Sequence, residues 1–335
     1  MKKQTAAIKK FTALVLKTLK VHKFRFFRIA LVALLLFLFP SPNIYYSFGM
    51  LDENPSAKSE INLPPAPKYP INFTNFYPQY LTAEGIVVLD VPSGIILYSK
   101  NSENRLSPAS TTKIATALVA FDSYKLDDIL EVKTIEGNGS SMGLVKGEKI
   151  TFESLLYGLL VASANDAAVT LAENYPGGPD AFVGAMNKKV RFLKLHNTHF
   201  TNPTGFDYPG HYTSAQDLAR LATVMLKDKT LAKIVATRAI TVSDTSYTYF
   251  HDLKNVNQLL GDIPGVAGVK TGYTENAEEC VVTLVKRDDH EVLTVVLRSE
   301  DRFRETNDLI SWVFQNYKWV DIADYDKSIP TSQGK

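Results

Sequence analysis

The chain has 335 residues, 45% of them hydrophobic and 21% charged, which is the composition of a globular protein with one large or two modest domains. Nine of the 37 basic residues and none of the 35 acidic residues precede Ile29, so the remainder carries a formal charge of −7. That distribution excludes the basic folded domain of a nucleic-acid-binding protein, and the single cysteine, Cys280, excludes an intrachain disulfide and a cysteine-rich zinc site.

The N-terminal part of the chain predicts a membrane-targeting segment. Residues 29–51 contain no charged side chain, and Ile29 to Phe39 are apolar throughout. The short apolar run suits a signal peptide, whereas the whole uncharged stretch is long enough to span a bilayer. No A-x-A cleavage site follows it, so a membrane anchor is favoured over a cleaved signal segment. The upstream cations place residues 1–28 in the cytoplasm and the rest of the chain on the extracytoplasmic side.

The remaining elements are predicted from periodicity and from turn residues. Residues 52–80 carry six prolines and predict a semi-extended linker, and ordered structure is expected to begin at Gly85 with a strand hairpin around Pro92-Ser93-Gly94. Helices are predicted at residues 108–121, 152–162, 166–173, 181–195, 214–226 and 305–317, and further strands at residues 268–273, 280–286 and 292–297. Strands at both ends and helices between them predict an α+β fold, within the broad α/β class, over residues 81–320, followed by a tail at 321–335.

Ser110-Thr111-Thr112-Lys113 places a hydroxyl and an amine three residues apart, on one face of a predicted helix. A lysine with an ordinary pKa of about 10.4 is protonated at pH 7, so a role as base requires desolvation or a second cation, which Lys270 could supply. Ser110 also lies in the first turn, where free backbone N–H groups favour an oxyanion. The motif alone is weak, because an exposed serine and lysine on a helix explain it as well.

Two further motifs follow in the chain. Ser163-Ala164-Asn165 lies at the break between two apolar helical patterns, where an ordinary helix cap is the alternative explanation. Lys270-Thr271-Gly272 ends a strand pattern and occurs once. A cation, a hydroxyl and a residue without a side chain on one strand edge would bind a carboxylate and allow close backbone approach.

The order S-x-x-K, S-x-N, K-T-G, with separations of roughly 50 and 100 residues, resembles the low-molecular-mass penicillin-binding proteins, the serine-type D-alanyl-D-alanine carboxypeptidase family. The similarity covers about residues 83–317 and includes RLSPASTTKIATALVA, GSSMGLVKGEKIT, LLVASANDAA, HNTHFTNPTGFDYPGHYTSAQDLARL, GVKTGYTENAEEC and DRFRE. It implies a penicillin-binding/β-lactamase-like fold, with an antiparallel sheet flanked by helices and a helical subdomain. It also implies peptidoglycan stem peptides as substrates, β-lactam antibiotics as covalent inhibitors, and no cofactor.

The resemblance implies a role for each residue of the first two motifs. Ser110 would attack the carbonyl of the penultimate D-alanine, and Lys113 would take its proton. Ser163 would relay protons between Lys113 and the leaving amine, and Asn165 would hold the peptide backbone. Water would then hydrolyse the acyl-enzyme.

For the third motif, the resemblance implies that Lys270 and Thr271 face the terminal carboxylate beside Gly272. The backbone N–H of Tyr273 would complete the oxyanion hole with that of the nucleophile. Arg304 matches an arginine that the family places near the carboxylate, although a surface salt bridge explains an arginine there as well.

The sequence departs from the family at two places, since the family usually has glycine at Glu278 or Glu279 and again at Arg298. Side chains there could narrow the cleft or change its preference. We also expect the chain to lack the β-rich C-terminal domain of larger members, so that anchoring falls to the N-terminal segment. Shorter members include endopeptidases that cut D-alanyl cross-links, and endopeptidase action is therefore the nearest alternative.

A β-lactamase and an inactive binding protein are less well supported. A class A β-lactamase needs a deacylating glutamate, but no E-x-x-x-N occurs in the chain, and Glu173 lies too close behind the second motif. An inactive wall-binding or penicillin-sensing protein would not need every catalytic position filled. His196 and His199 are explained by a surface turn and His211 by a structural role, so no metal site is predicted.

Overall fold

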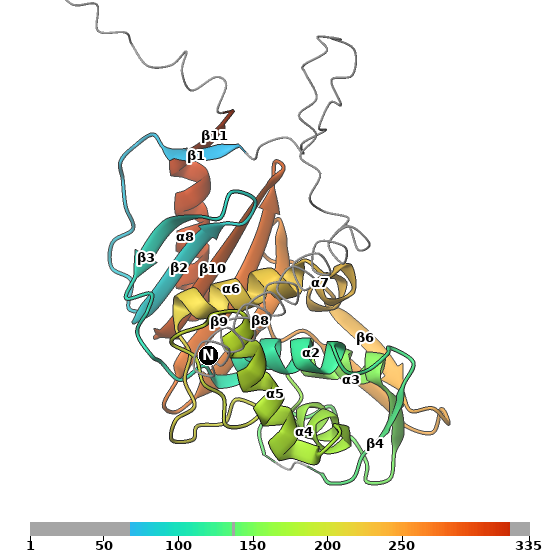
Figure 1. The fold of residues 1–335 in the computed structure, drawn as a ribbon. Helices are drawn as coiled ribbons and strands as arrows, with labels where there is room; N and C mark the ends of the chain where they lie inside the picture. Colours follow the sequence, from blue (N-terminus) through green and yellow to red (C-terminus); the bar gives the residue numbers. More distant parts are fainter. Residues whose placement is uncertain (1–67, 136–137, 322–335) are drawn as a thin grey trace, which may run out of the picture. The chain divides into compact units, whose positions relative to one another are not determined.

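The computed structural model of the protein describes residues 68–135 and 138–321 (Figure 1). The predicted cytoplasmic region, the membrane segment and most of the linker lie outside the described residues, as does the tail from residue 322. All described residues belong to one compact unit, Pro64–Lys335, and the other unit is Met1–Leu63. Over the described residues, every helix is too short or too polar to cross a bilayer.

The centre of the domain is a five-stranded antiparallel sheet with the strand order β3-β2-β10-β9-β8 (Figure 1). Its strands come from the two ends of the domain: β2 (Gly85–Asp90), β3 (Ile95–Lys100), β8 (Val266–Thr274), β9 (Glu278–Arg287) and β10 (His290–Ser299). The predicted α+β class, with a sheet assembled from both chain ends, is therefore confirmed.

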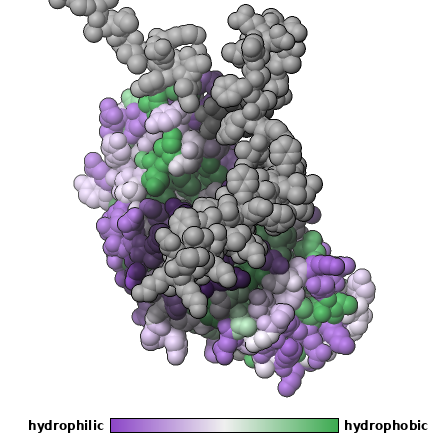
Figure 2. Space-filling model, in the orientation of Figure 1, coloured by the Kyte–Doolittle hydropathy of each residue, from purple (hydrophilic) through white to green (hydrophobic). Residues whose placement is uncertain are grey.

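Two helices cover this sheet, α6 (Ala215–Leu226) on one face and α8 (Arg302–Asn316) on the other (Figure 1). The middles of β9 and β10 are runs of valine, leucine and threonine that are fully buried, because both of their faces meet a helix. Figure 2 shows hydrophobic residues gathered where the sheet extends beyond α6, and a second hydrophobic group toward β4 (Ile129–Glu131) and β6 (Ala239–Ser243).

The chain between β3 and β8 forms the helical part of the domain. Its helical elements besides α6 are the 3₁₀ turn η1 (Ala109–Thr112), α2 (Lys113–Phe121), α3 (Phe152–Leu160), α4 (Asn165–Asn174), α5 (Gly178–Phe192) and α7 (Lys229–Val235). Thr151, Ser214 and Asp228 cap α3, α6 and α7 by accepting hydrogen bonds from backbone N–H groups of the first turn. The sequence pattern did not predict α7, whose seven residues are too few to show a clear period.

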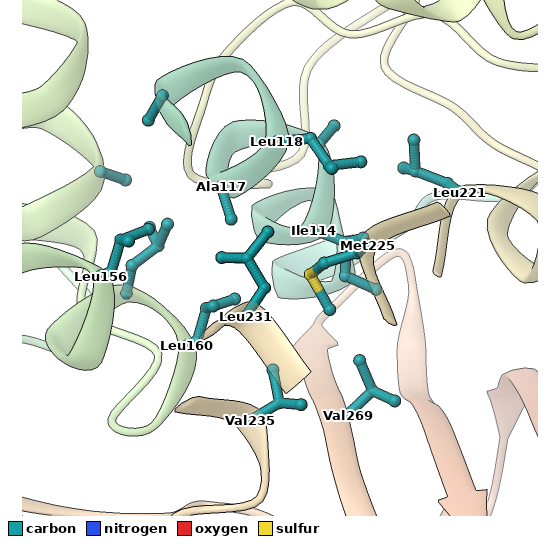
Figure 3. Packing of buried hydrophobic residues seen from close by; sticks show 14 of the residues in the cluster. Ile114, Ala117, Leu118, Leu156, Leu160, Leu221, Met225, Leu231, Val235 and Val269 are labelled. Atoms are coloured by element: carbon teal, nitrogen blue, oxygen red, sulfur yellow. The ribbon is translucent and has the colours of Figure 1, made fainter. Parts of the chain in front are cut away.

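The helix α2 is buried on all sides, from Lys113 to Ala120. Figure 3 shows its apolar side chains facing those of α3, α6, α7 and strand β8, with Leu231 and Val269 among the contacts. Such close packing leaves α2 little freedom to shift. The turn η1 at its N-terminus is therefore held in a fixed place beside the sheet.

Ordered structure begins earlier than predicted. The strand β1 (Tyr69–Asn72) pairs antiparallel with β11 (Tyr317–Val320), so the expectation that order starts at Gly85 is wrong. The sequence around β1 does not indicate this pairing, because β11 lies about 250 residues further along the chain. The two-stranded ladders of β4 (Ile129–Glu131) with β5 (Lys149–Thr151), and of β6 (Ala239–Ser243) with β7 (Phe250–Lys254), were also not predicted.

A buried carboxylate joins the two ends of the domain. Glu305, on the first turn of α8, accepts hydrogen bonds from the hydroxyls of Thr82 and Ser299 at 2.8 Å each, and from the backbone N–H groups of Thr82 and Ala83. Burial alone would raise the pKa of Glu305, but these hydrogen bonds outweigh it and hold the pKa below its usual value. The ionised carboxylate thus connects α8 with the approach to β2 and the end of β10.

Replacement of Glu305 by glutamine should lower the free energy of unfolding at pH 7 by about 1–3 kcal/mol, because an amide cannot satisfy all of these donors. Ionised Glu305 stabilises the folded protein fully when the pH is above the ordinary pKa of a glutamate. This stabilisation is lost as the pH falls through the lower pKa that Glu305 has in the folded protein. The difference between Glu305→Gln and the original protein in urea unfolding should therefore shrink in acid. Asp308→Asn, an exposed change on the same helix, is the control, and equal stabilities of the two variants at pH 7 would contradict this account.

Candidate active site

The first motif forms the contact that its spacing predicted. Ser110 lies in η1 and Lys113 begins α2, and the Lys113 Nζ atom is 3.0 Å from Ser110 Oγ. The same Nζ donates to Asn165 Oδ1 and to the backbone oxygen of Thr204, each at 2.7 Å. An ammonium group has three donors, and all three have an oxygen partner. A neutral amine would keep two of these bonds and turn its lone pair toward the Ser110 hydroxyl.

Burial lowers the pKa of Lys113 from its ordinary value to about 7, and the nearby Asp166 carboxylate opposes that change. Lys113 has no exposed surface. The sequence left open whether desolvation or the charge of Lys270 would lower this pKa, and desolvation is the main cause. A substantial fraction of Lys113 is therefore neutral at pH 7.

The second and third motifs meet beside this pair. Lys270 Nζ donates to Ser163 Oγ at 2.8 Å and to the backbone oxygen of Thr271 at 2.9 Å. Burial, followed by the charges of Lys113 and Arg302, lowers the pKa of Lys270 well below its ordinary value. Three cationic groups thus lie together, and an anion among them would relieve their mutual repulsion.

Ser163 and Asn165 are placed by the break between α3 and α4. Ser163 has a φ of 61°, a left-handed conformation that is unusual for serine. Asn165 is the first residue of α4, and its backbone N–H donates to Ser140 O at 2.7 Å while its side-chain amide donates to Asn138 O at 2.9 Å. Asn165 therefore holds the loop that contains Asn138 and Ser140, as well as contacting Lys113.

The strand β8 lies directly against the turn η1, which carries Ser110. A Cβ atom added to Gly272 would lie 2.8 Å from Ser110 N and 2.9 Å from Ala109 Cβ. On the other side, one added to Gly205 would lie 2.0 Å from Ala109 O, and Ala109 itself has a φ of 47°. The turn is thus held between two glycines, and Thr271 and Tyr273 flank one of them on β8.

Two loops that sequence reasoning missed complete the site. The Asp166 carboxylate accepts hydrogen bonds from Ser141 Oγ at 2.6 Å and from the backbone N–H groups of residues 142–144 at 3.0–3.1 Å. The Asn202 Oδ1 atom accepts from the N–H groups of residues 204–206, which shapes the turn that presents Thr204 O to Lys113. Glycines and short polar residues in both segments were the available signal.

His211 supports the turn η1 through Thr112. The Thr201 N–H donates to His211 Nδ1 at 3.0 Å, so Nε2 carries the proton and donates to Thr112 Oγ1 at 2.9 Å. Burial, followed by the nearby His199, lowers the pKa of His211 to about 4. His211 is therefore neutral at pH 7, and its contacts agree with the structural role expected for it. Across the described residues, no group of three or more histidine, cysteine, aspartate or glutamate side chains could hold a metal ion.

The prediction for Arg304 is corrected. Its half-exposed guanidinium lies 3.6 Å from Asp301 and 3.4 Å from Asp308 in surface ion pairs. The arginine that faces the site is Arg302, whose Nη1 donates to Gly272 O at 2.7 Å. Residues two apart on a helix point about 200° apart, so only one of the two can face β8.

The departures from the expected glycines fall where the backbone itself favours glycine. Glu278 and Arg298 have φ values of 51° and 53°. The Arg298 guanidinium does not reach the K-T-G strand face but donates to Glu84 Oε2 at 2.9 Å and to Asn276 O at 2.8 Å. Asp207 accepts hydrogen bonds from the Asn276 N–H and from Thr274 Oγ1, which also hold the β8–β9 turn in place.

Comparison with known proteins gives one consistent result. Residues 73–301 match the family described as D-alanyl-D-alanine carboxypeptidase. The chain is 37% identical over 246 residues to D-alanyl-D-alanine carboxypeptidase DacF of Bacillus subtilis, an alignment that covers 70% of this chain and 63% of DacF. It is 34% identical over 209 residues to a D-alanyl-D-alanine endopeptidase of Pseudomonas aeruginosa, which covers 61% of this chain and 67% of that protein.

A solved structure shares the fold. The crystal structure of a Streptomyces DD-transpeptidase superposes with a TM-score of 0.68 at 31% identity, covering 72% of this chain and all of that one. The likeness confirms the penicillin-binding fold expected from the motifs. The chain spans slightly less than two thirds of the length of DacF.

The pKa of Lys113 predicts the pH dependence of Ser110 acylation. If neutral Lys113 takes the serine proton, the rate of labelling by a fluorescent penicillin should rise with pH, with a midpoint near 7. This rate is measured by quenching the labelling reaction after successive times at each of a series of pH values. A rate that is the same from pH 6 to pH 9 would contradict the role of Lys113 as base.

Gly272→Ala should push β8 away from η1, because the new methyl group would meet Ser110 N. We expect labelling of Ser110 to slow by on the order of 100-fold, the effect of a displacement of about 1 Å. Gly184→Ala is the matched control, since a Cβ there meets nothing within 4 Å. Similar labelling rates for the two variants would show that the close approach at Gly272 is not needed.

Proposed function

Because the chain belongs to the D-alanyl-D-alanine carboxypeptidase family, we propose that it removes the terminal D-alanine from peptidoglycan stem peptides through an acyl-enzyme on Ser110. The observation that carries this proposal is the contact of 3.0 Å between Ser110 Oγ and Lys113 Nζ, in which a fully buried lysine has a pKa of about 7. A base with that pKa is active near neutral pH.

In the acylation step, neutral Lys113 takes the hydroxyl proton while Ser110 Oγ bonds to the carbonyl carbon of the penultimate D-alanine. The oxyanion so formed is stabilised by the backbone N–H groups of Ser110 and Tyr273. The bond to the terminal D-alanine then breaks, and its amine receives the proton from Lys113 through Ser163. Free D-alanine and the acyl-enzyme result, and water activated by Lys113 later hydrolyses the ester and restores the hydroxyl of Ser110.

Substrate recognition depends on the cluster of positive groups. The charges of Lys113 and Arg302 disfavour the protonated form of Lys270 in the absence of an anion. A terminal carboxylate near Lys270 and Thr271 would relieve that repulsion, which contributes to binding and favours the protonated form of Lys270. A β-lactam, which carries a carboxylate beside its reactive amide, would occupy the same position and acylate Ser110.

A cross-link-cutting endopeptidase is the second candidate function, and it is favoured by the similarity to the Pseudomonas aeruginosa endopeptidase. The two activities use the same chemistry and differ in the leaving group, which is free D-alanine in one case and a second stem peptide in the other. Chromatography of wall fragments after incubation separates them: carboxypeptidase action shortens monomers by one D-alanine, whereas endopeptidase action converts dimers to monomers.

We place the active domain on the extracytoplasmic face of the cell membrane, held there by residues 29–51 acting as an anchor. The support is the uncharged stretch that follows nine cations in the sequence, together with the extracytoplasmic location of peptidoglycan. Mass spectrometry of the protein extracted from membranes tests the anchor, since a mature N-terminus after residue 51 would show that the segment had been removed.

The full chain in detergent should release D-alanine from a peptide that ends in D-Ala-D-Ala, and it should be labelled by a fluorescent penicillin. Ser110→Ala should reduce both by at least about 1,000-fold, because the ester can form only on this hydroxyl. Ser123→Ala, which changes a serine just after α2, is the control and should leave both unchanged. Absence of release together with absence of labelling in the original protein would refute the proposed enzyme.

A further inference from the structure

Five exposed aromatic side chains lie within twelve residues at the start of the domain. They are Tyr69, Phe73, Phe76, Tyr77 and Tyr80, with exposed fractions between 48% and 91%. We call this group the aromatic surface. A soluble domain rarely exposes so many large rings in one short segment, and such a patch marks a surface that contacts a partner.

The segment that carries these rings is fixed to the domain by several hydrogen bonds. Trp312 Nε1, on α8, donates to Phe76 O at 2.8 Å, and the backbone N–H of Phe73 donates to Asn316 O at 3.0 Å. The Tyr77 ring lies 6.3 Å from the Trp312 ring, and β1 pairs with β11 beside them. The rings are therefore presented outward by a rigid frame, which reduces the ordering cost of any binding event.

A cavity of 660 Å³ opens between this segment and α8, lined by Phe76, Pro78, Tyr80 and Trp312 together with polar side chains such as Asp308. One lysine contacts the aromatic surface, since Lys318 Nζ lies 4.6 Å from the centre of the Phe73 ring. Lys68 precedes β1 but lines a separate pocket with Asp90 and Asp289. The surface thus combines aromatic rings with a positive charge, which suits the headgroup region of a bilayer that contains anionic lipid.

The position of the aromatic surface in the chain points to the same partner. Sixteen residues, 52–67, separate the uncharged segment from Lys68, and they can span at most about 58 Å. Tyrosine and tryptophan rings are enriched at the boundary between lipid and water. We propose that the aromatic surface docks on the phospholipid bilayer in which residues 29–51 are anchored, an inference that rests on that proposed anchoring.

Docking would also orient the enzyme. In Figure 1 the strands β1 and β11 lie at one end of the sheet, and α2, which directly follows η1 in the chain, lies toward the opposite end. A domain held to the bilayer through β1 and β11 would direct Ser110 away from the lipid and toward the cell wall. The aromatic surface would then set the orientation of the domain, and the anchor only its distance.

The lone cysteine allows a direct test in the full chain. Cys280 is fully buried and burial raises the pKa of its thiol to about 12, so a new surface cysteine can be labelled selectively. Tyr80→Cys carries an environment-sensitive fluorophore on the aromatic surface. Phe192→Cys is the matched control, an aromatic residue with 80% exposure on α5. Both proteins are reconstituted in vesicles of phosphatidylcholine and phosphatidylglycerol.

We expect the fluorophore at position 80, but not the one at 192, to shift its emission to shorter wavelength in vesicles and to be quenched by brominated lipid. Phe76→Ser combined with Tyr77→Ser should remove the larger part of that shift while penicillin labelling stays unchanged. Protein that floats with the vesicles but shows no shift at position 80 would overturn the docking alone. A shift that appears without lipid, on addition of glycan fragments or at high protein concentration, would assign the surface to the wall or to a second copy and would also overturn it.

The outcomes separate the linked proposals. Failure of the protein to float with the vesicles would refute the anchor and the docking together, whereas penicillin labelling would still report on the enzyme. Loss of labelling in the original protein would refute the proposed activity without bearing on the position of the fluorophore.

Discussion

The removal of the Lys113 amine from water is the constraint on which the site depends. Burial lowers its pKa to about 7, and the three oxygen atoms around Nζ hold it beside Ser110. Each of these oxygens comes from a different part of the chain, and each part needs its own support. Three features exclude water from the Lys113 amine and hold it in position. They are the helical core around α2, the loop shaped by Asn202 and the break before α4.

The contacts that the sequence could predict are the local ones. The contact of Ser110 with Lys113 results from helical spacing, and it was predicted from three residues of separation. The contact of Lys270 with Ser163 joins residues 107 apart, so spacing alone could not predict it. The family resemblance assigned both residues to one site but did not predict the hydrogen bond between them. Arg302 and Arg304 are equally plausible in the sequence, and the direction in which the start of α8 points decides between them.

The same distinction between local and distant contacts explains the fold. The long strands β9 and β10 contain apolar runs that are evident in the sequence. These runs contributed to the prediction of a sheet built from strands at both ends of the domain. Short elements escaped detection, as did the pairing of β1 with β11, whose stability comes from a distant partner rather than from its own residues. The roles of Asp166 and Glu305 were not predicted for a related reason. The sequence does not distinguish a buried carboxylate from an exposed one when its hydrogen-bond donors lie elsewhere in the chain.

A sheet whose neighbouring strands come from opposite ends of the domain has a consequence for biosynthesis. A growing chain presents β2, β3 and the turn η1 early, but each residue of β10 follows its partner in β2 by more than 200 positions. Until then Ser110 has no β8 beside it, and the apolar face of β2 has no partner. The site therefore stays incomplete until β8, β9 and β10 have been made, so Ser110 would become reactive only late in biosynthesis.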